Sequence, residues 1–439
     1  KMNPEIKQRI EMIQKGEVPE GYKQTKIGII PNDWKVEKLG NLTKLIKDGT
    51  HGTHKNVENG VPLLSAKDIN DKIKFPNDCR RISEKDFNQI HKNYTILSND
   101  LLLTVVGTLG RSALVKTISP KFTLQRSVAI LRFKEEVDMN YIYSFTKTFS
   151  FQLELLKKSN SSAQAGVYLG DLGKIIVPFP PLPEQSSIAS ILTNQDNLIE
   201  LKEKLLEEKK KLKKSLMQNL LTGKVRLKGF HDEWKEVKLK KVLKERKTYS
   251  SKGKEYEHIS LTKKGVVVKS DRYERDFLVK AEDKQYKITY LNDICYNPAN
   301  LKFGVICRNS FGTGIFSPIY VTFEVIKDNI PFIEYLLTST NEVRKIRRYE
   351  EGTVYERMAV KPEDFLKHKI LLPSLEEQEK IAEILENQDK EISLIQEEIN
   401  LLKLQKKSLM QLLLTGIVRV PENMISQITN SGFKEEVEQ

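Results

Sequence analysis

Long apolar runs are absent from this chain of 439 residues, and no stretch of about 18 consecutive apolar residues is available to cross a membrane. Cysteine is scarce as well. The three cysteines, Cys79, Cys295 and Cys307, are too few for a disulfide framework. This scarcity favours a reducing compartment, so we expect a cytoplasmic protein. The Lys-rich start also lacks the apolar core of a signal peptide.

Motifs for catalysis are missing too. No G-x-x-x-x-G-K-[ST] phosphate loop occurs, and the glycines at 107–110 and 312–314 do not have the spacing of a dinucleotide fingerprint. His51 and His54 are three positions apart, but no second ligand pair follows at zinc spacing. We therefore expect no catalytic residue, no metal and no bound cofactor on this chain.

Positive charge is what the sequence has in excess, and it is localised. The formal net charge is +14. Residues 30–175 hold 22 Lys+Arg against 15 Asp+Glu, and residues 228–370 hold 29 against 21. Two separate basic segments indicate a polyanion that is bound at two places. The length suffices for two or three domains, each with its own core.

A long internal repeat organises the chain. Residues 184–226 recur 193 positions later as residues 377–419, aligned without a gap. The repeat keeps polar words as well as apolar positions: "NQD" at 194–196 and 387–389, "KKSLMQ" at 213–218 and 406–411, and "LLTG" at 220–223 and 413–416. An unconstrained solvated helix would drift after duplication, so this register predicts that the two copies pack on each other.

The apolar residues of the repeat recur with a helical period. The pattern predicts two long antiparallel helices that pair along a seam, each roughly 57 Å long at about 1.5 Å per residue. Thr222-Gly223 and Thr415-Gly416 predict where the helices stop. The seam residues of the first copy are predicted to be Ile191, Leu198, Leu205 and Leu212, flanked by Leu192, Ile199 and Leu206. In the second copy one row holds Ile381, Ile395, Leu402 and Leu409, and another holds Leu385, Ile392, Ile399 and Leu413.

A globular body precedes each helix. "IIPNDW" opens the first body with Trp34, "GFHDEW" opens the second with Trp234, and prolines close both bodies. The predicted segments are an N-terminal appendage (1–27), a first body (28–181), a central helix (182–225), a second body (226–374), a C-terminal helix (375–419) and a loose tail (420–439).

Short β-type runs dominate inside both bodies, with helical stretches at 141–157 and 330–347. We predict an α/β (α+β) fold with a curved sheet in each body and leave the strand order open. Shared words such as Asn99-Asp100 and Asn292-Asp293 indicate scaffold. The remaining sequence differs between the bodies, as expected where each body recognises something different.

Taken together, these motifs resemble the specificity subunit of a type I restriction–modification system. The resemblance covers residues 28–420. It rests on the doubled, proline-led E-Q…LLTG helix, the "P-x-D-W" opening at 31–34 and the loop "SNSSAQAGVYLGDL" before the first helix. The second body departs from this pattern, because its corresponding loop, "RRYEEGTVYERMAV", lacks the Ser/Gln-rich word.

The resemblance implies a division of labour. Each body would be a target-recognition domain for one half of a split DNA sequence, and the helices would set the gap and dock two methyltransferase (M) subunits. Restriction/translocase (R) subunits would complete an adenine methyltransferase and endonuclease, with S-adenosylmethionine, ATP and Mg²⁺ on the partner subunits. Asn297-Pro298-Ala299 lacks the second proline and the aromatic residue of a base-holding methyltransferase motif, which agrees with a non-catalytic chain.

Base edges are read by side chains in the groove, while phosphate contacts set the register. Arginine suits a guanine edge and glutamine an adenine edge. Candidates in the first body are Thr50, His51, Thr53, His54, Lys55, Arg80, Arg81, Arg111, Gln125, Arg126, Ser161, Gln164 and Tyr168. Those in the second body are Lys247, Tyr249, Ser250, Lys252, Lys254, Arg272, Tyr273, Asn300, Lys302, Arg308, Arg347, Arg348, Tyr355 and Arg357.

Both bodies would face one side of the duplex with half-site centres roughly 34 Å apart, and the target would be asymmetric because the bodies differ. For the polar words of the helices, partner docking and hydrogen bonding between the helices are equal alternatives; the residues concerned are Asn194, Gln195, Asp196, Asn387, Gln388 and Asp389. A type IIB-like recognition subunit is a rival that neighbouring genes would separate. A coiled-coil scaffold without a DNA role conflicts with the localised charge.

Overall fold

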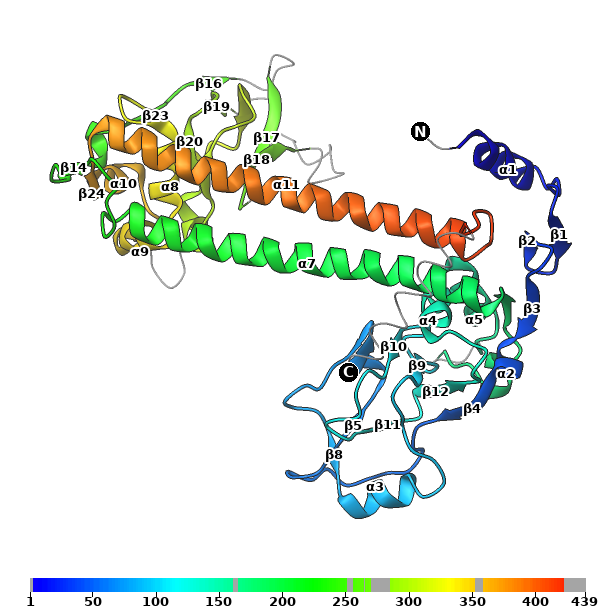
Figure 1. Cartoon of the computed structure of the whole chain (residues 1–439). Coiled ribbons are helices and arrows are strands. Elements are labelled where there is room, and N and C mark those ends of the chain that lie inside the picture. Colours follow the sequence, from blue (N-terminus) through cyan, green and yellow to red (C-terminus); the bar gives the residue numbers. More distant parts are fainter. Residues whose placement is uncertain are drawn as a thin grey trace. The chain divides into compact units, whose positions relative to one another are not determined.

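The computed structural model describes residues 3–160, 165–250, 256–263, 265–269, 285–351 and 358–421. The chain divides into two compact units. Unit 1 comprises Lys1–Leu201 and Ile399–Gln439, and unit 2 comprises Lys202–Glu398. The division falls inside both long helices, so each helix contributes residues to both units. Figure 1 shows the two helices in green and orange. None of the helices in the described ranges has the length and apolar content that a membrane span requires.

The two long helices are α7 (Leu182–Leu220) and α11 (Leu375–Leu413), each 39 residues in length. Both are followed by a glycine in the left-handed region, Gly223 with φ +70° and Gly416 with φ +72°. Glycine adopts this conformation without strain because it has no Cβ, and such a residue commonly ends a helix. The predicted stop signals are therefore used.

Contacts within each unit show that α7 and α11 are antiparallel. In unit 1, Gln195 Nε2 donates to the Leu402 carbonyl at 3.1 Å. In unit 2, Lys202 pairs with Glu398 at 2.8 Å and Lys209 with Glu391 at 2.6 Å. As the residue number rises along α7 it falls along α11. The predicted fold class, including the paired helices, is confirmed.

The seam predicted for the second copy is correct, but the row predicted for the first copy is shifted by one position. Leu192, Ile199 and Leu206 are buried in α7, whereas Leu198 and Leu212 are 39% and 45% exposed. The physical reason is that lysines 202 and 209 occupy seam positions of α7 and pair with glutamates of α11. Because lysines interrupt the apolar pattern at the true seam, the exposed row with Leu198 and Leu212 was the longer apolar row in the sequence.

The first body is built on a four-stranded antiparallel sheet of order β10-β9-β12-β4 and a three-stranded sheet of order β11-β5-β8, in which β11 and β5 are parallel. Two-stranded ladders join β13 to β3 and β6 to β7. Its strands are β3 (Lys35–Lys38), β4 (Thr43–Asp48), β5 (Val61–Leu64), β6 (Ile69–Asn70), β7 (Lys72–Ile73), β8 (Arg81–Ile82), β9 (Leu101–Thr104), β10 (Ser112–Leu114), β11 (Thr123–Leu124), β12 (Val128–Phe133) and β13 (Ile176–Phe179). Its helices are α2 (Leu39–Leu42), α3 (Glu84–Ile90), α4 (Met139–Thr146), α5 (Phe149–Lys157) and α6 (Leu169–Leu172), with the 3₁₀ turn η1 (Ala66–Asp68).

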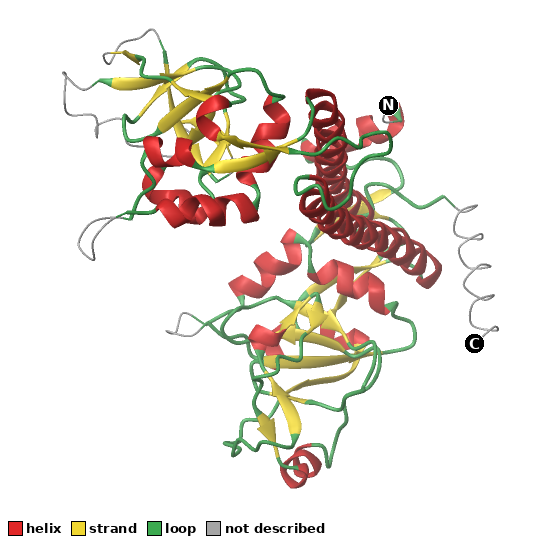
Figure 2. Cartoon of the chain, turned by 90° about the vertical axis from the view of Figure 1, so that its left-hand side faces the viewer, coloured by secondary structure: helices red, strands yellow, loops and turns green. Residues whose placement is uncertain are grey.

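The second body repeats this scaffold, because its four-stranded sheet has the corresponding order β15-β23-β20-β21 and its five-stranded sheet, β16-β19-β22-β17-β18, also contains one parallel pair. Figure 2 shows the strands in yellow and the helices in red. Its strands are β14 (Lys235–Lys238), β15 (Leu243–Glu245), β16 (Tyr249–Ser250), β17 (Glu257–Thr262), β18 (Gly265–Val268), β19 (Tyr286–Thr289), β20 (Ile294–Tyr296), β21 (Ile306–Arg308), β22 (Gly314–Phe316), β23 (Val321–Val325) and β24 (Lys369–Leu372). Its helices are α8 (Ile330–Thr338), α9 (Thr340–Ile346) and α10 (Pro362–Lys367), with the 3₁₀ turns η2 (Leu239–Lys241), η4 (Pro298–Phe303) and η5 (Arg347–Tyr349).

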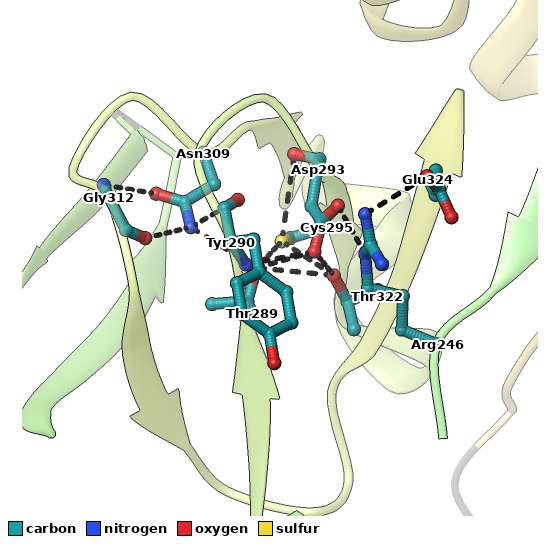
Figure 3. Close-up of polar contacts among 9 residues, drawn as sticks. All are labelled: Arg246, Thr289, Tyr290, Asp293, Cys295, Asn309, Gly312, Thr322 and Glu324. Carbon is teal, nitrogen blue, oxygen red and sulfur yellow. Dashed lines mark hydrogen bonds and ion pairs between the residues drawn. The ribbon is translucent and has the colours of Figure 1, made fainter. Parts of the chain in front are cut away.

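The repeated Asn-Asp word forms the same turn in both bodies. Asn99 and Asn292 take positive φ values of 67° and 71°. The following aspartate is buried and accepts hydrogen bonds from a backbone amide and an arginine, which is Arg132 for Asp100 and Arg246 for Asp293, both at 2.8 Å. Figure 3 shows the network of the second body, in which the hydroxyls of Thr289 and Thr322 also donate to the Asp293 carboxylate. These words are therefore scaffold.

A buried carboxylate at the start of α7 holds unit 1 together. Glu184 is 3% exposed and accepts a hydrogen bond from the indole of Trp34 at 2.9 Å. The guanidinium of Arg419, which follows α11, donates to both Glu184 oxygens at 2.6 and 2.7 Å and also to Asp33. Burial alone would lower the pKa of Arg419, but the hydrogen bonds to Glu184 and Asp33 outweigh it and hold that pKa above its ordinary value.

Unit 2 contains the same arrangement. Glu377 of α11 accepts from the Trp234 indole at 3.2 Å and from Arg226, which follows α7, at 2.8 Å to both oxygens. The neighbouring glutamines, Gln185 and Gln378, are buried and bond the backbone at the starts of α4 and α8. The repeated Glu-Gln word thus joins the opening of each body, the start of one helix and the end of the other helix.

The N-terminal residues contact the chain just after α11. They form α1 (Pro4–Gln14), β1 (Tyr22–Thr25) and β2 (Gly28–Pro31). The Tyr22 hydroxyl donates to the Gly416 carbonyl at 2.9 Å, and Arg9 donates to the Ile417 carbonyl at 3.0 Å. The segment predicted as an appendage therefore contributes to unit 1, and the tail beyond residue 421 lies outside the described residues.

We predict that Glu184→Gln destabilises unit 1. The substitution keeps the side-chain size but removes the buried carboxylate, so that the Arg419 guanidinium is left with the more exposed carboxylate of Asp33. Removing one partner of a buried pair costs about 2–4 kcal/mol. Urea unfolding of the full chain measures the change. Glu135→Gln is the matched control, because Glu135 is 93% exposed and pairs with Lys44 at the surface. Equal unfolding midpoints for the two variants would contradict the prediction.

Candidate nucleic-acid interface

Backbone bridges bring four segments of the first body together. Thr50 bridges Gln125, and the Arg126 amide donates to the Thr50 carbonyl at 3.1 Å. The Val105 amide donates to the carbonyl of residue 127 at 2.9 Å, and Val106 bridges Gly166. The loop after β4, the turn after β11, the β9–β10 loop and the loop before α6 are therefore neighbours. This is the surface on which most candidates of the first body lie.

Several residues predicted to contact DNA make hydrogen bonds that stabilise the loops of this surface. His51 bonds Asp48 at 2.6 Å, His54 bonds the Thr50 hydroxyl at 2.8 Å, and Arg80 donates to the His54 carbonyl at 2.6 Å. Arg81 donates to the Gly60 carbonyl at 3.1 Å. Within the described ranges, no three His, Cys, Asp or Glu side chains gather where they could hold a metal ion. The two histidines thus shape the loop between β4 and β5.

Other predicted residues remain available to a ligand. Lys55 and Arg126 are exposed, Arg111 and Gln125 are partly exposed, and Tyr168 is 66% exposed. Among the described residues none of the three cations has a side-chain partner. Thr53 is likewise exposed in the same loop. An exposed cation near polar groups can contact phosphate or a base edge.

The structure divides the candidates of the second body. Arg308 donates to Glu334 at 2.9 Å and lies 3.7 Å from Glu386, and Arg347 donates to Glu350 at 2.7 Å. Burial raises the pKa of Glu334, and Arg308 opposes this shift. Arg308 and Arg347 are therefore engaged in holding the fold.

The remaining described candidates of the second body lie at the surface. Tyr249, on β16, is 43% exposed, with the Lys287 ammonium 5.7 Å from its ring centroid. Lys247 pairs loosely with Glu245 at 3.6 Å. The others on described elements are Ser250, Asn300, Lys302 and Arg348. Eight candidates lie outside the described residues: Ser161, Gln164, Lys252, Lys254, Arg272, Tyr273, Tyr355 and Arg357.

The polar words of the long helices pair with each other. Lys406 of the second "KKSLMQ" pairs with Asp196 of the first "NQD", and Lys213 pairs with Asp389 in the same way. Asp389 also accepts from the Tyr335 hydroxyl at 2.7 Å, and burial, followed by this carboxylate, raises the pKa of Tyr335. Hydrogen bonding between the helices is thus one use of these words.

The other members of these words differ in exposure. Gln195 bonds α11, while Gln388 donates to Glu391 at 3.3 Å and its carbonyl oxygen has no partner among the described residues. Asn194 and Asn387 are exposed. The two asparagines therefore stay open to a partner protein.

With this geometry established, comparison with known proteins gives the family. The family described as "Type I restriction modification DNA specificity domain" matches residues 31–211 and again residues 231–404. The chain belongs to this family and carries two copies of its domain. Each match contains one body and most of the following long helix, which is the repeat seen in the structure.

Curated relatives and solved structures agree with this assignment. The chain is 28% identical over 435 residues to the specificity subunit assigned to the type I restriction enzyme MjaX of Methanocaldococcus jannaschii, covering 91% of this chain and 97% of the relative. It is 28% identical to the EcoBI specificity subunit of Escherichia coli over 36% of this chain and 34% of that one. The type I S subunit structure from M. genitalium superposes with a TM-score of 0.52 at 15% identity, covering 87% of this chain and 96% of that one. A structure described as showing assembly and conformational transition of the type I R-M system gives 0.52 at 15%, covering 89% and 99%.

We predict that Arg126→Ala weakens DNA binding and leaves stability unchanged, because the Arg126 side chain is exposed and has no partner among the described residues. Loss of one phosphate contact should lower the slope of log affinity against log salt by about 1. Fluorescence anisotropy with duplex DNA over a salt series measures this slope.

Arg308→Ala is the contrasting variant. It should lower the unfolding midpoint, because Glu334 then keeps a half-buried carboxylate without its cation. Unchanged DNA binding by Arg126→Ala, combined with weakened binding by a stably folded Arg308→Ala, would reverse the two roles.

Proposed function

We propose that this chain is the DNA sequence-recognition subunit of a type I restriction–modification complex and reads a split, asymmetric target. One body reads each half-site. The observation that carries the proposal is that the two bodies share one sheet order, and that a tryptophan of each body makes the same contact with a glutamate of a long helix. Their exposed loops, in contrast, differ. A shared frame with different loops is what two different half-sites require.

Charge and loop placement support DNA as the ligand. Both bodies are basic, with 22 Lys+Arg against 15 Asp+Glu in residues 30–175 and 29 against 21 in residues 228–370. On the first body, exposed cations lie on neighbouring loops with a glutamine and a tyrosine. Contacts to the phosphates of the DNA position such a protein, and side chains at base edges give specificity.

The long helices are proposed to set the spacer and to bind the partners. Exposed leucines on α7 and α11 include Leu201 and Leu394, which are 62% and 57% exposed and occupy equivalent positions of the repeat. Exposed leucines on a paired helix suit a further helix from another protein. We assign these faces, with Asn194 and Asn387, to methyltransferase subunits.

Catalysis would then belong to the partners. S-adenosylmethionine would be held by the methyltransferase subunits, and ATP and Mg²⁺ by the restriction/translocase subunits. The assembled complex would methylate adenine and cleave DNA. On this chain, the side chains bind and orient DNA.

Deletion of the gene should abolish methylation at one motif. Genome-wide adenine-methylation sequencing with and without the gene should show a split, asymmetric motif that loses methylation. Restoring the gene on a plasmid should recover the same motif. Unchanged methylation in cells that express a partner methyltransferase would overturn the proposed function.

Lengthening both helices should change the spacer alone. One heptad inserted after Leu201 and one before Ile399 keeps the seam in phase, because these positions lie beside the Lys202–Glu398 pair. Seven residues add about 10 Å, so the spacer should lengthen by up to about three base pairs. Both half-sites should stay the same in the methylation map. An unchanged spacer would contradict the proposal that the helices set its length.

A further inference from the structure

The loop between β20 and β21 in the second body is held in one conformation. Leu301 is fully buried, and the Asn297 side chain accepts from the Ala299 amide at 3.1 Å. Gly304 ends the 3₁₀ turn η4 in the left-handed region with φ +72°. The Val360 amide also donates to the Pro298 carbonyl at 3.3 Å. Side chains on this loop are therefore placed by a rigid backbone.

Phe303 projects from this loop into solvent. Its side chain is 54% exposed although the residue lies two positions after the buried Leu301. The ammonium groups of Lys302 and Lys263 lie 5.1 Å and 5.4 Å from the ring centroid. A solvent-exposed ring on a rigid loop gains little for folding, since the apolar face is left in water. An aromatic face with cations beside it matches a nucleobase with its flanking phosphates.

The equivalent loop of the first body shows that the scaffold does not need this ring. The β9–β10 loop also contains a left-handed glycine, Gly110 with φ +79°. The residue before it is Leu109, which is partly buried against the core. Gln152 fills the space beside Gly110 and donates to its carbonyl at 2.9 Å. The exposed ring is thus a feature of the second body, where the two loops differ.

We propose that Phe303 stacks on a nucleobase in the half-site bound by the second body, with Lys302 and Lys263 on the flanking phosphates. This inference rests on the proposed function and names the contact. An apolar side chain that enters a base step partly unstacks it, and the exposed base face then packs on the ring. The sequence indicated Lys302 but not Phe303, because an apolar residue in a loop is usually buried. It did not indicate Lys263 either, because only the fold places this lysine beside the ring.

The test uses duplexes that carry the methylated motif, with 2-aminopurine placed in turn at each position of each half-site. Binding of the wild-type chain should change the fluorescence at one step of the second half-site. Phe303→Ala should abolish that change and weaken binding roughly tenfold or more, with the salt slope kept. Phe303→Leu keeps an apolar side chain without an aromatic face and should also lose the signal.

Matched variants separate stacking from other effects. Phe149→Ala removes a ring that is 81% exposed on α5 of the first body and should leave affinity and fluorescence unchanged. Lys302→Ala and Lys263→Ala should each lower the salt slope by about 1 while the fluorescence change persists. Equal unfolding midpoints exclude misfolding of a variant.

The outcomes are distinguishable. A wild-type chain that shows no preference for the motif overturns the proposed function itself. A wild-type chain that prefers the motif, with Phe303→Ala binding equally well and giving the same fluorescence change, overturns only the stacking contact.

Discussion

The structure depends on two buried carboxylates, Glu184 and Glu377, and on what each one binds. Each lies in the first turn of a long helix and accepts from a tryptophan of the adjoining body and from an arginine that follows the other helix. A buried carboxylate is tolerated only with such partners, because desolvation opposes its charge. The requirement for an arginine and an indole donor at one place therefore fixes where each body begins and where each helix ends. The rest of each unit packs around this contact of glutamate, tryptophan and arginine. The main core of unit 1 includes Ile188 and Leu413, and that of unit 2 includes Leu220 and Ile381.

Arginine has two uses in this chain, and the difference between them is functional. Arg226, Arg246, Arg308 and Arg419 hold carboxylates inside the fold. Arg126 and Lys55 lie in loops that backbone bridges gather on one surface of the first body. Fewer cations are thus available for contacts at the surface than the count of lysines and arginines suggests, because some of them pair with acids inside the fold. What distinguishes the two bodies is the content of corresponding loops on one conserved sheet order.

Much of this architecture was predictable from residues alone. The gapless repeat, the Thr-Gly stops and the Trp openings predict two bodies and two paired helices, and the structure contains all of them. The seam row predicted for the first copy was wrong, because a lysine can be assigned to the seam only when its glutamate partner on the other helix is known. The ion pair of Arg308 could not be predicted for the same reason: no sequence pattern shows that Glu334 lies beside it. Strand order could not be predicted, since β11 and β5 are far apart in the sequence and yet pair in parallel, with Thr123 opposite Leu63.

Unit 2 is made of one continuous stretch of chain, whereas unit 1 needs residues from both ends. Protein synthesis runs in one direction, so all of unit 2 has left the ribosome while unit 1 still lacks Arg419 and the second half of α11. The first body, although translated before the second, stays without its part of α11 and without Arg419 until these have been translated. Its share of the helix seam and the carboxylate of Glu184 are without their partners during that interval. Unit 2 therefore becomes complete before unit 1, although the first body is translated before the second.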